Sequence, residues 1–158
     1  MAADDNTLGA PIGRVVRVLL DTNVVLDWLF NRAPWADEAL PLWQARDAGQ
    51  LIAYLPASAL TDIFYIARRQ VGAMAALAGV DRCLALEIVP VEKATVLRAR
   101  TLPGSDFEDN AGMACAEAAR LDFIITRDPH DFQQSPVTAI TPDDLLTYLP
   151  SLDRPKKP

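Results

Sequence analysis

The spacing of apolar residues divides the chain into strand-length and helix-length segments that alternate. Apolar, β-branched runs predict strands over residues 15–20, 51–55, 88–91, 122–126 and 137–140. Apolar residues at helical spacing predict helices over residues 24–30, 35–46, 58–70, 71–86, 92–100, 105–120 and 142–148. Strands that alternate with helices favour a three-layer α/β/α sandwich around a central, mainly parallel sheet of four to five strands.

Composition and the character of the chain ends predict one domain. The 158 residues are 51% hydrophobic, which is enough to bury a single core. Polar, turn-forming ends predict a disordered extension over residues 1–13 and a flexible tail over 150–158, with the domain between them at 14–149. Cys83 and Cys115 lack the spacing of a metal or redox motif, and neither a signal peptide nor a long apolar run is evident. We therefore expect a cytoplasmic protein without membrane contact.

The distribution of charged and nucleophilic residues argues against several classes of function. A net charge of −6 argues against a protein that coats nucleic-acid phosphates with Lys and Arg. His130 is the single histidine, and no serine lies in a G-x-S-x-G motif, which argues against a triad hydrolase. The glycine-rich G-x-G-x-x-G and G-x-x-x-x-G-K-[ST] nucleotide motifs are missing. Carboxylates therefore remain the main candidates for catalytic or ligand-binding groups.

Aspartates from four separate segments are predicted to meet at one edge of the sheet. Asp21 and Asp128 directly follow predicted strands, and ligands of parallel sheets bind beyond the carboxyl ends of the strands. Asp62 and Asp109 lie near the starts of predicted helices, as does Asp106. The helix that carries Asp109 is predicted to begin with a capping box, because Ser105-Asp-Phe-Glu matches the S-x-x-E pattern. Each aspartate alone is equally well explained as a helix cap or a turn residue. Because all four segments deliver one to the same edge, we favour a shared functional site.

Such a site predicts a bound divalent cation. Four neighbouring carboxylates repel one another and raise their pKa values, and a cation removes that repulsion. Oxygen-only ligands suit Mg²⁺ or Mn²⁺. The metal would bind a scissile phosphate and activate water, with one or two ions compatible with the sequence. Metal rather than Lys and Arg would then neutralise the phosphate.

Four short motifs in this order resemble the PIN-domain ribonucleases, including VapC-like toxins. They are Leu19-Leu-Asp-Thr-Asn, Ser58-Ala-Leu-Thr-Asp-Ile, Asp106-Phe-Glu-Asp-Asn and Ile124-Ile-Thr-Arg-Asp, and together they span nearly the whole domain. The resemblance implies a PIN-like fold and a Mg²⁺- or Mn²⁺-dependent endoribonuclease. It further implies a toxin of a type II toxin–antitoxin pair, with a small antitoxin as partner and a homodimeric state.

The resemblance also implies roles for particular residues. Asp21, Asp109, Asp128 and Asp62 would be the catalytic and metal-binding acids, although many family members have Glu at the position of Asp62. An Asp is one methylene shorter, so a water-mediated contact is left open there. The supporting polar residues implied are Thr22, Asn23, Asp106 and Thr126.

Two further questions concern which residues bind RNA and whether Asp in place of Glu at position 62 changes the function. Arg68, Arg69 and Arg127 are candidates for binding RNA, against the alternative of solvated surface. The Asp62 departure supports a second hypothesis, in which a catalytically inactive PIN fold serves as a binding or regulatory module. A phosphatase or DNA nuclease is a third, but Asn23 stands where a D-x-D phosphatase motif has its second Asp.

Overall fold

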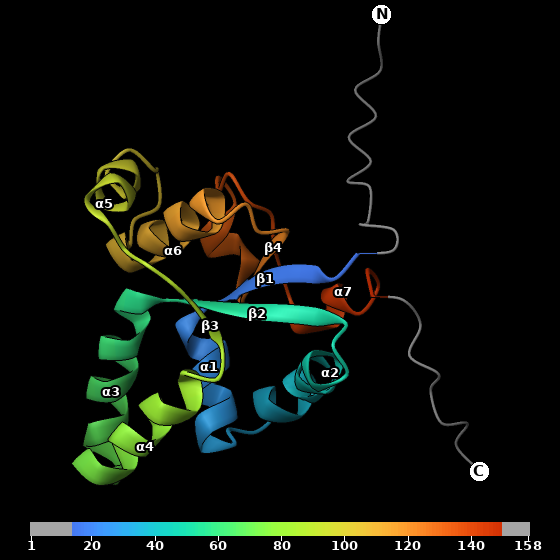
Figure 1. Cartoon of the computed structure of the whole chain (residues 1–158), viewed down its shortest axis with the longest axis vertical. Coiled ribbons are helices and arrows are strands. Elements are labelled where there is room, and N and C mark those ends of the chain that lie inside the picture. Colours follow the sequence, from blue (N-terminus) through green and yellow to red (C-terminus); the bar gives the residue numbers. More distant parts are fainter. Residues whose placement is uncertain (1–13, 150–158) are drawn as a thin grey trace, which may run out of the picture.

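The computed structural model describes residues 14–149, which form a parallel five-stranded sheet between two layers of helices (Figure 1). The predicted N-terminal extension (1–13) and C-terminal tail (150–158) lie outside the described residues. The strands are β1 (Val16–Leu20), β2 (Leu51–Pro56), β3 (Glu87–Val89), β4 (Phe123–Ile125) and β5 (Ala139–Ile140). The helices are α1 (Thr22–Phe30), α2 (Trp35–Asp47), α3 (Ala57–Val71), α4 (Ala73–Cys83), α5 (Lys93–Ala99), α6 (Phe107–Ala118), the short 3₁₀ helix η1 (Pro129–Phe132) and α7 (Pro142–Leu145). No helix within residues 14–149 is long and apolar enough to cross a membrane.

The alternation of side chains along β1 explains the layers. Val18 and Leu20 point into a core shared with α1, α2, α3 and α7, whereas Leu19 points into a second core with α5 and α6. In Figure 1, α5 and α6 lie on one side of the sheet, and α1 to α4 lie on the other. Each face of a strand thus packs on its own helical layer, because successive side chains point to opposite faces. The predicted three-layer α/β/α sandwich with a parallel sheet is confirmed.

The strand order creates a switch point at β1. The order is β3-β2-β1-β4-β5, and all neighbours pair in parallel. In the sheet, β2 and β3 lie on one side of β1, and β4 and β5 lie on the other. In such sheets a crevice opens beyond the carboxyl ends of the two strands at the switch, here β1 and β4.

Several observed elements are shorter than predicted, β3 and the last helix among them. Residues 88–91 were expected to be a strand, but β3 ends at Val89 because Pro90 has no N–H to donate to a sheet. The last helix was expected to reach residue 148, but it ends at Leu145 and continues as tight turns with i to i+3 hydrogen bonds.

Candidate functional site

Asp21 lies at the switch point, immediately after β1. Its N–H donates to the Ile125 carbonyl at 2.9 Å, which fixes the residue beside the end of β4. The Thr126 hydroxyl donates to Asp21 Oδ2 at 2.9 Å, and the carboxylate makes no helix-capping bond to α1. Burial raises the pKa of Asp21, whereas the Thr126 hydroxyl, the adjacent Thr22 backbone and the charge of Arg127 lower it. A helix cap therefore does not explain this residue.

The start of α6 brings three further acids to the same edge of the sheet. Asp106 is the N-cap of α6, and its carboxylate accepts the Glu108 N–H at 2.8 Å. The predicted Ser105 capping box is therefore wrong, because Asp106 takes the capping position one residue later. The Glu108 side chain is then free to accept a hydrogen bond from the Thr22 hydroxyl at 2.8 Å. This bond joins the start of α6 to the start of α1.

Buried Asn110 holds the loop that leads into α6. Its side-chain amide donates to the carbonyls of Leu102 and Gly104, both at 3.1 Å. A Cβ on Gly104 would lie only 2.2 Å from Asn110 Oδ1, so this close approach requires a residue without a side chain. The loop that leads to the acids of α6 is thus fixed by the Asn110 side chain.

Asp109 is the most strongly perturbed acid within residues 14–149. Burial raises the pKa of Asp109 to about 7, and the charges of Asp21, Asp106, Asp131 and Glu108 add to the rise. A raised pKa with these causes means that several carboxylates face one another without enough positive charge to offset them.

Glu108 and Asp62 extend the same group of acids. Burial raises the pKa of Glu108, with further contributions from the charges of Asp62, Asp106 and Asp21. Burial also raises the pKa of Asp62 on α3, followed by the charge of Asp106. Asp62 therefore lies on the Asp106 side of the group. We call these six residues the acidic cluster: Asp21, Asp62, Asp106, Glu108, Asp109 and Asp131.

A small cavity lies within this cluster. Asp21, Thr22, Ser58, Glu108 and Asp109 are among the residues that line it, and its volume is about 20 Å³. That volume holds about one water-sized group. The carboxylates of Asp21, Glu108 and Asp109 therefore border one shared space, whose other walls include apolar side chains.

Two members of the acidic cluster, Glu108 and Asp131, were not predicted as site residues from the sequence. Glu108 was assigned to the capping box, although its place directly before Asp109 could have indicated a second acid of the site. Asp131 was missed because Asp128, three residues earlier, follows β4 more closely.

Asp128 itself caps η1. Its carboxylate accepts the His130 N–H at 3.1 Å, and its own N–H donates to the Thr126 hydroxyl oxygen at 3.2 Å. The described contacts do not join its carboxylate to Asp21 or Asp109. The role of Asp128 as a metal ligand stays a prediction.

Asn23, a predicted supporting residue, is exposed on α1.

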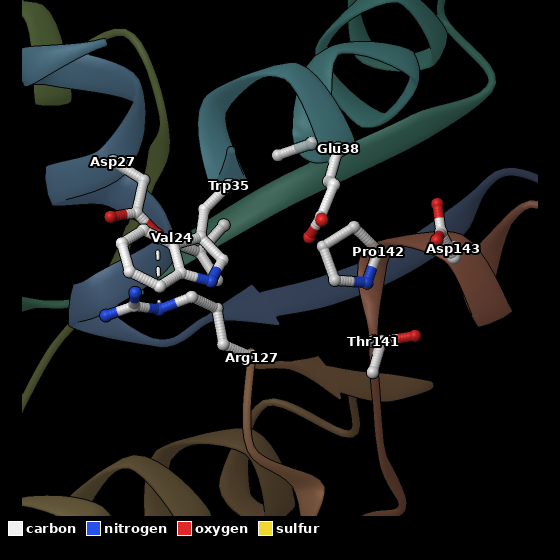
Figure 2. Close-up of a pocket in the computed structure, with 9 residues that line it drawn as sticks. Val24, Asp27, Trp35, Glu38, Arg127, Thr141, Pro142 and Asp143 are labelled. Atoms are coloured by element: carbon white, nitrogen blue, oxygen red, sulfur yellow. Dashed lines mark ion pairs between the residues drawn. The ribbon is translucent and has the colours of Figure 1, made fainter. Parts of the chain in front are cut away.

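The three candidate arginines differ in their surroundings. Arg68 and Arg69 are exposed in the last turn of α3, about 9 and about 10.5 Å along the helix axis from Asp62 at about 1.5 Å per residue. Arg127 instead pairs with buried Asp27, and its guanidinium lies 4.1 Å from the centroid of the Trp35 ring (Figure 2). Of these three arginines, Arg68 and Arg69 are the ones that are exposed to solvent.

The acidic cluster matches the ligand chemistry of Mg²⁺ or Mn²⁺ but is not arranged as a finished coordination sphere. Its members offer carboxylate oxygens, which hard divalent cations prefer. Within residues 14–149, no three Asp, Glu, His or Cys side chains are already grouped closely enough to hold an ion. The cluster thus has the right donors and unrelieved mutual repulsion, and ion binding requires side chains to move together.

Comparisons with known proteins agree with this architecture. A family model described as "PIN domain" matches residues 17–130, and comparison with curated protein sequences gives no match. Among solved structures, Mycobacterium tuberculosis VapC20, described as a sarcin-ricin loop cleaving toxin, is similar with a TM-score of 0.61 and 14% identity over 72% of this chain and 92% of that chain.

Two further structures are similar at comparable levels. DNA-bound VapBC from Salmonella typhimurium has a TM-score of 0.61 and 16% identity, covering 81% of this chain and 99% of that chain. FitAcB from Neisseria gonorrhoeae has a TM-score of 0.58 and 22% identity, covering 79% of this chain and 97% of that chain. At these identities the likeness is one of fold. Because the family model spans well over half of the sequence, this chain belongs to the PIN domain family.

Proposed function

We propose that this protein is a Mg²⁺- or Mn²⁺-dependent endoribonuclease that hydrolyses RNA phosphodiester bonds. The observation that carries the proposal is the state of Asp109, whose pKa of about 7 results from burial and from four neighbouring carboxylates. Perturbed acids of this kind concentrate at functional sites. Membership of the PIN domain family, whose members are typically nucleases, supports the same reaction class.

We assign different roles to the acids and to the hydroxyl groups that contact them. Asp21 and Asp109 are the principal candidates to hold the ion, with Asp128 and Asp62 as the further acids that the family resemblance implies. A bound Mg²⁺ or Mn²⁺ supplies charge neutralisation of the phosphate and a more acidic water. Thr126 orients Asp21 through the 2.9 Å hydrogen bond. Thr22 orients Glu108, which makes Glu108 a further candidate for binding the ion or its water.

The overall charge is consistent with RNA that is recognised locally. With a net charge of −6, the chain cannot rely on a basic surface to attract the backbone. Arg68 and Arg69 are exposed and remain candidates for phosphate contacts beside the cluster. Arg127 is engaged by Asp27 and Trp35, so a direct contact with RNA would require it to leave them.

We assign the protein to the toxin half of a toxin–antitoxin pair. The support is its fold, since similar structures include VapBC from Salmonella typhimurium and FitAcB from Neisseria gonorrhoeae. A small antitoxin would be its partner, and a homodimer its expected state. Induced expression should then arrest growth, Asp21→Asn should abolish the arrest, and size-exclusion chromatography with light scattering should report a dimer.

The decisive experiment is cleavage of RNA by purified protein with EDTA, Mg²⁺ or Mn²⁺. We expect metal-dependent cleavage that Asp21→Asn and Asp109→Asn each reduce by at least about 100-fold while circular dichroism stays native. Asp37→Asn, an exposed acid in the first turn of α2, is the matched control and should retain activity. Parallel assays on DNA and a phosphate monoester test the other phosphate chemistries. Cleavage that survives both cluster substitutions would refute the proposal.

A binding or regulatory module without catalysis is the second candidate. The observation in its favour is that no three potential ligands within residues 14–149 are already grouped around an ion position. Calorimetry separates the two functions. Absence of Mg²⁺ and Mn²⁺ binding at millimolar concentration, together with absence of cleavage, would favour the module over the enzyme.

A further inference from the structure

Asp27 is a charged residue buried in the apolar face of α1. It is 1% exposed and follows Val24, Val25 and Leu26, which are also buried. Neither carboxylate oxygen has a hydrogen-bond partner within the described residues. Two guanidinium groups compensate its charge instead: Arg127 Nε lies 3.2 Å from Oδ2, and Arg32 Nη1 lies 3.8 Å from Oδ1.

Arg127 is held on two sides. Figure 2 shows its guanidinium beside the Asp27 carboxylate and against the Trp35 ring, whose centroid lies 4.1 Å from the guanidinium carbon. Stacking on an aromatic face together with an ion pair restricts a long side chain that otherwise has many rotamers. Asp27 and Trp35 therefore select one position of Arg127.

The open space beside Arg127 shows why this selection matters. A cavity of about 160 Å³ is lined by Arg127 and Trp35 and also by Glu38, Thr141 and Asp143. Without Asp27, the guanidinium has room to turn towards two other carboxylates, those of Glu38 and Asp143. Figure 2 places both on the side of the cavity away from Asp27.

The backbone of Arg127 connects this buried pair to the acidic cluster. Its neighbour Thr126 donates its hydroxyl to Asp21 Oδ2 at 2.9 Å. Its other neighbour, Asp128, donates its N–H to that same hydroxyl oxygen at 3.2 Å. Asp131 follows in η1, and its charge acts on Asp109. A shift of Arg127 therefore moves residues on both sides that touch or face the cluster.

We propose that Asp27 is a positioning residue for the acidic cluster, acting through Arg127 on the loop over residues 126–131. It lies on the same helix that Asp21 begins, so α1 carries both an acid of the site and the anchor for the facing loop. The ion pair fixes the position of Arg127 and thereby keeps the Thr126 hydroxyl aimed at Asp21. This inference rests on the proposed ion-binding function of the cluster.

The test compares Asp27→Asn with Arg32→Gln as the matched control. Asp27→Asn removes the buried carboxylate and releases Arg127, whereas Arg32→Gln removes only the second partner of that carboxylate and leaves the pair with Arg127 intact. We expect Asp27→Asn to weaken Mn²⁺ binding, measured by electron paramagnetic resonance or calorimetry, by about 10-fold or more, as removal of an outer partner of a metal ligand typically does. Arg32→Gln should stay within about twofold of wild type.

A double-substitution cycle tests the route through Arg127. If Asp27 acts through Arg127, the combined Asp27→Asn and Arg127→Gln protein should bind Mn²⁺ no more weakly than the worse single variant. Arg127→Lys, which keeps the charge but loses the planar stack on Trp35, should give a smaller loss and covers the case in which Asp27→Asn fails to fold. Additive losses in the cycle would overturn the inference.

A measurement on metal-free protein separates this inference from the proposed function. The NMR signals of the Thr126 methyl group and the Asp128 amide should shift in Asp27→Asn and remain in place in Arg32→Gln. If wild type binds no Mn²⁺ and cleaves no RNA, the proposed function fails, and these signals alone decide the coupling. Unchanged signals in Asp27→Asn with only a lower melting temperature would assign Asp27 to stability and refute positioning.

Discussion

Replacing Asp109 by Asn should stabilise the metal-free protein, because the acidic cluster opposes folding when it is ionised. The pKa of Asp109 rises from an ordinary value of 3.8 to about 7 in the folded state. That difference corresponds to about 4 kcal/mol at 1.36 kcal/mol per pKa unit. Solvent and counter-ions screen part of this cost, so we expect Asp109→Asn to raise the free energy of unfolding at pH 8 by about 1–2 kcal/mol.

The dependence on pH has a definite sign. Between about pH 4 and pH 7 the folded state binds the Asp109 proton and the unfolded state does not, so this residue makes stability fall as pH rises through that window. Below about pH 4 both states are protonated and the contribution is constant. The advantage of Asp109→Asn should therefore be less than half of its full size at pH 5 and reach its full size at pH 8.

The assay is thermal unfolding in EDTA at pH 5 and pH 8. A gain of 1–2 kcal/mol should raise the melting temperature by about 3–6 °C for a chain of this size. Asp37→Asn serves as the control and should change stability by less than about 0.5 kcal/mol. A lower melting temperature of Asp109→Asn at pH 8, or the same difference at both pH values, would refute the argument that the carboxylates repel one another.

Metal should reverse the order of stability. An ion that binds only the folded state adds about 2.7 kcal/mol at 100 times its dissociation constant. With saturating Mn²⁺ at pH 8, wild type should become more stable than Asp109→Asn, because the variant lacks a ligand. Calorimetric titration at the same pH measures the affinities directly. Equal stabilisation of both proteins by Mn²⁺ would show that Asp109 does not hold the ion.

Three further substitutions test other parts of the structure. Thr126→Val removes the hydroxyl that donates to Asp21 and should weaken Mn²⁺ binding by about 10-fold to 100-fold in calorimetry, whereas Thr126→Ser should restore most of it. Leu42→Ala empties part of the core and should cost about 2–5 kcal/mol in urea unfolding, while Leu40→Ala on the exposed side of the same helix should cost less than about 0.5 kcal/mol. Gly104→Ala forces a collision with the buried amide before α6 and should lower the free energy of unfolding by about 1–3 kcal/mol, measured in the same way.

The apolar pattern predicted the layers and the edge at which the acids collect. The run over residues 15–20 became β1, with alternate side chains in two cores, and the acid directly after it, Asp21, lies at the switch point. The start of the helix that carries Asp109 was predicted to within two residues. These features follow from hydrogen bonds and side-chain periodicity within a few residues, which local sequence is able to specify.

The finer arrangement of the site was not predictable, because its contacts join distant segments. Glu108 was expected to cap its own helix, yet it accepts a hydrogen bond from Thr22, 86 residues earlier in the chain. Thr126 bonds to Asp21 across 105 residues. Which partner a polar side chain takes depends on which elements pack against it, and on the space and burial that remain once they have packed.

The sequence by itself determined the sheet, its parallel layers and the supply of acids at one edge, since a period-2 or helical pattern selects an element and the face it buries. Only the tertiary structure decided which acids face one another. In the folded protein the charge of Asp131 acts on Asp109, and Asp128 caps η1. Arg127, 100 residues later in the chain, pairs with Asp27. Those choices depend on burial and on the balance of charge in three dimensions, to which neighbouring residues in the chain contribute little.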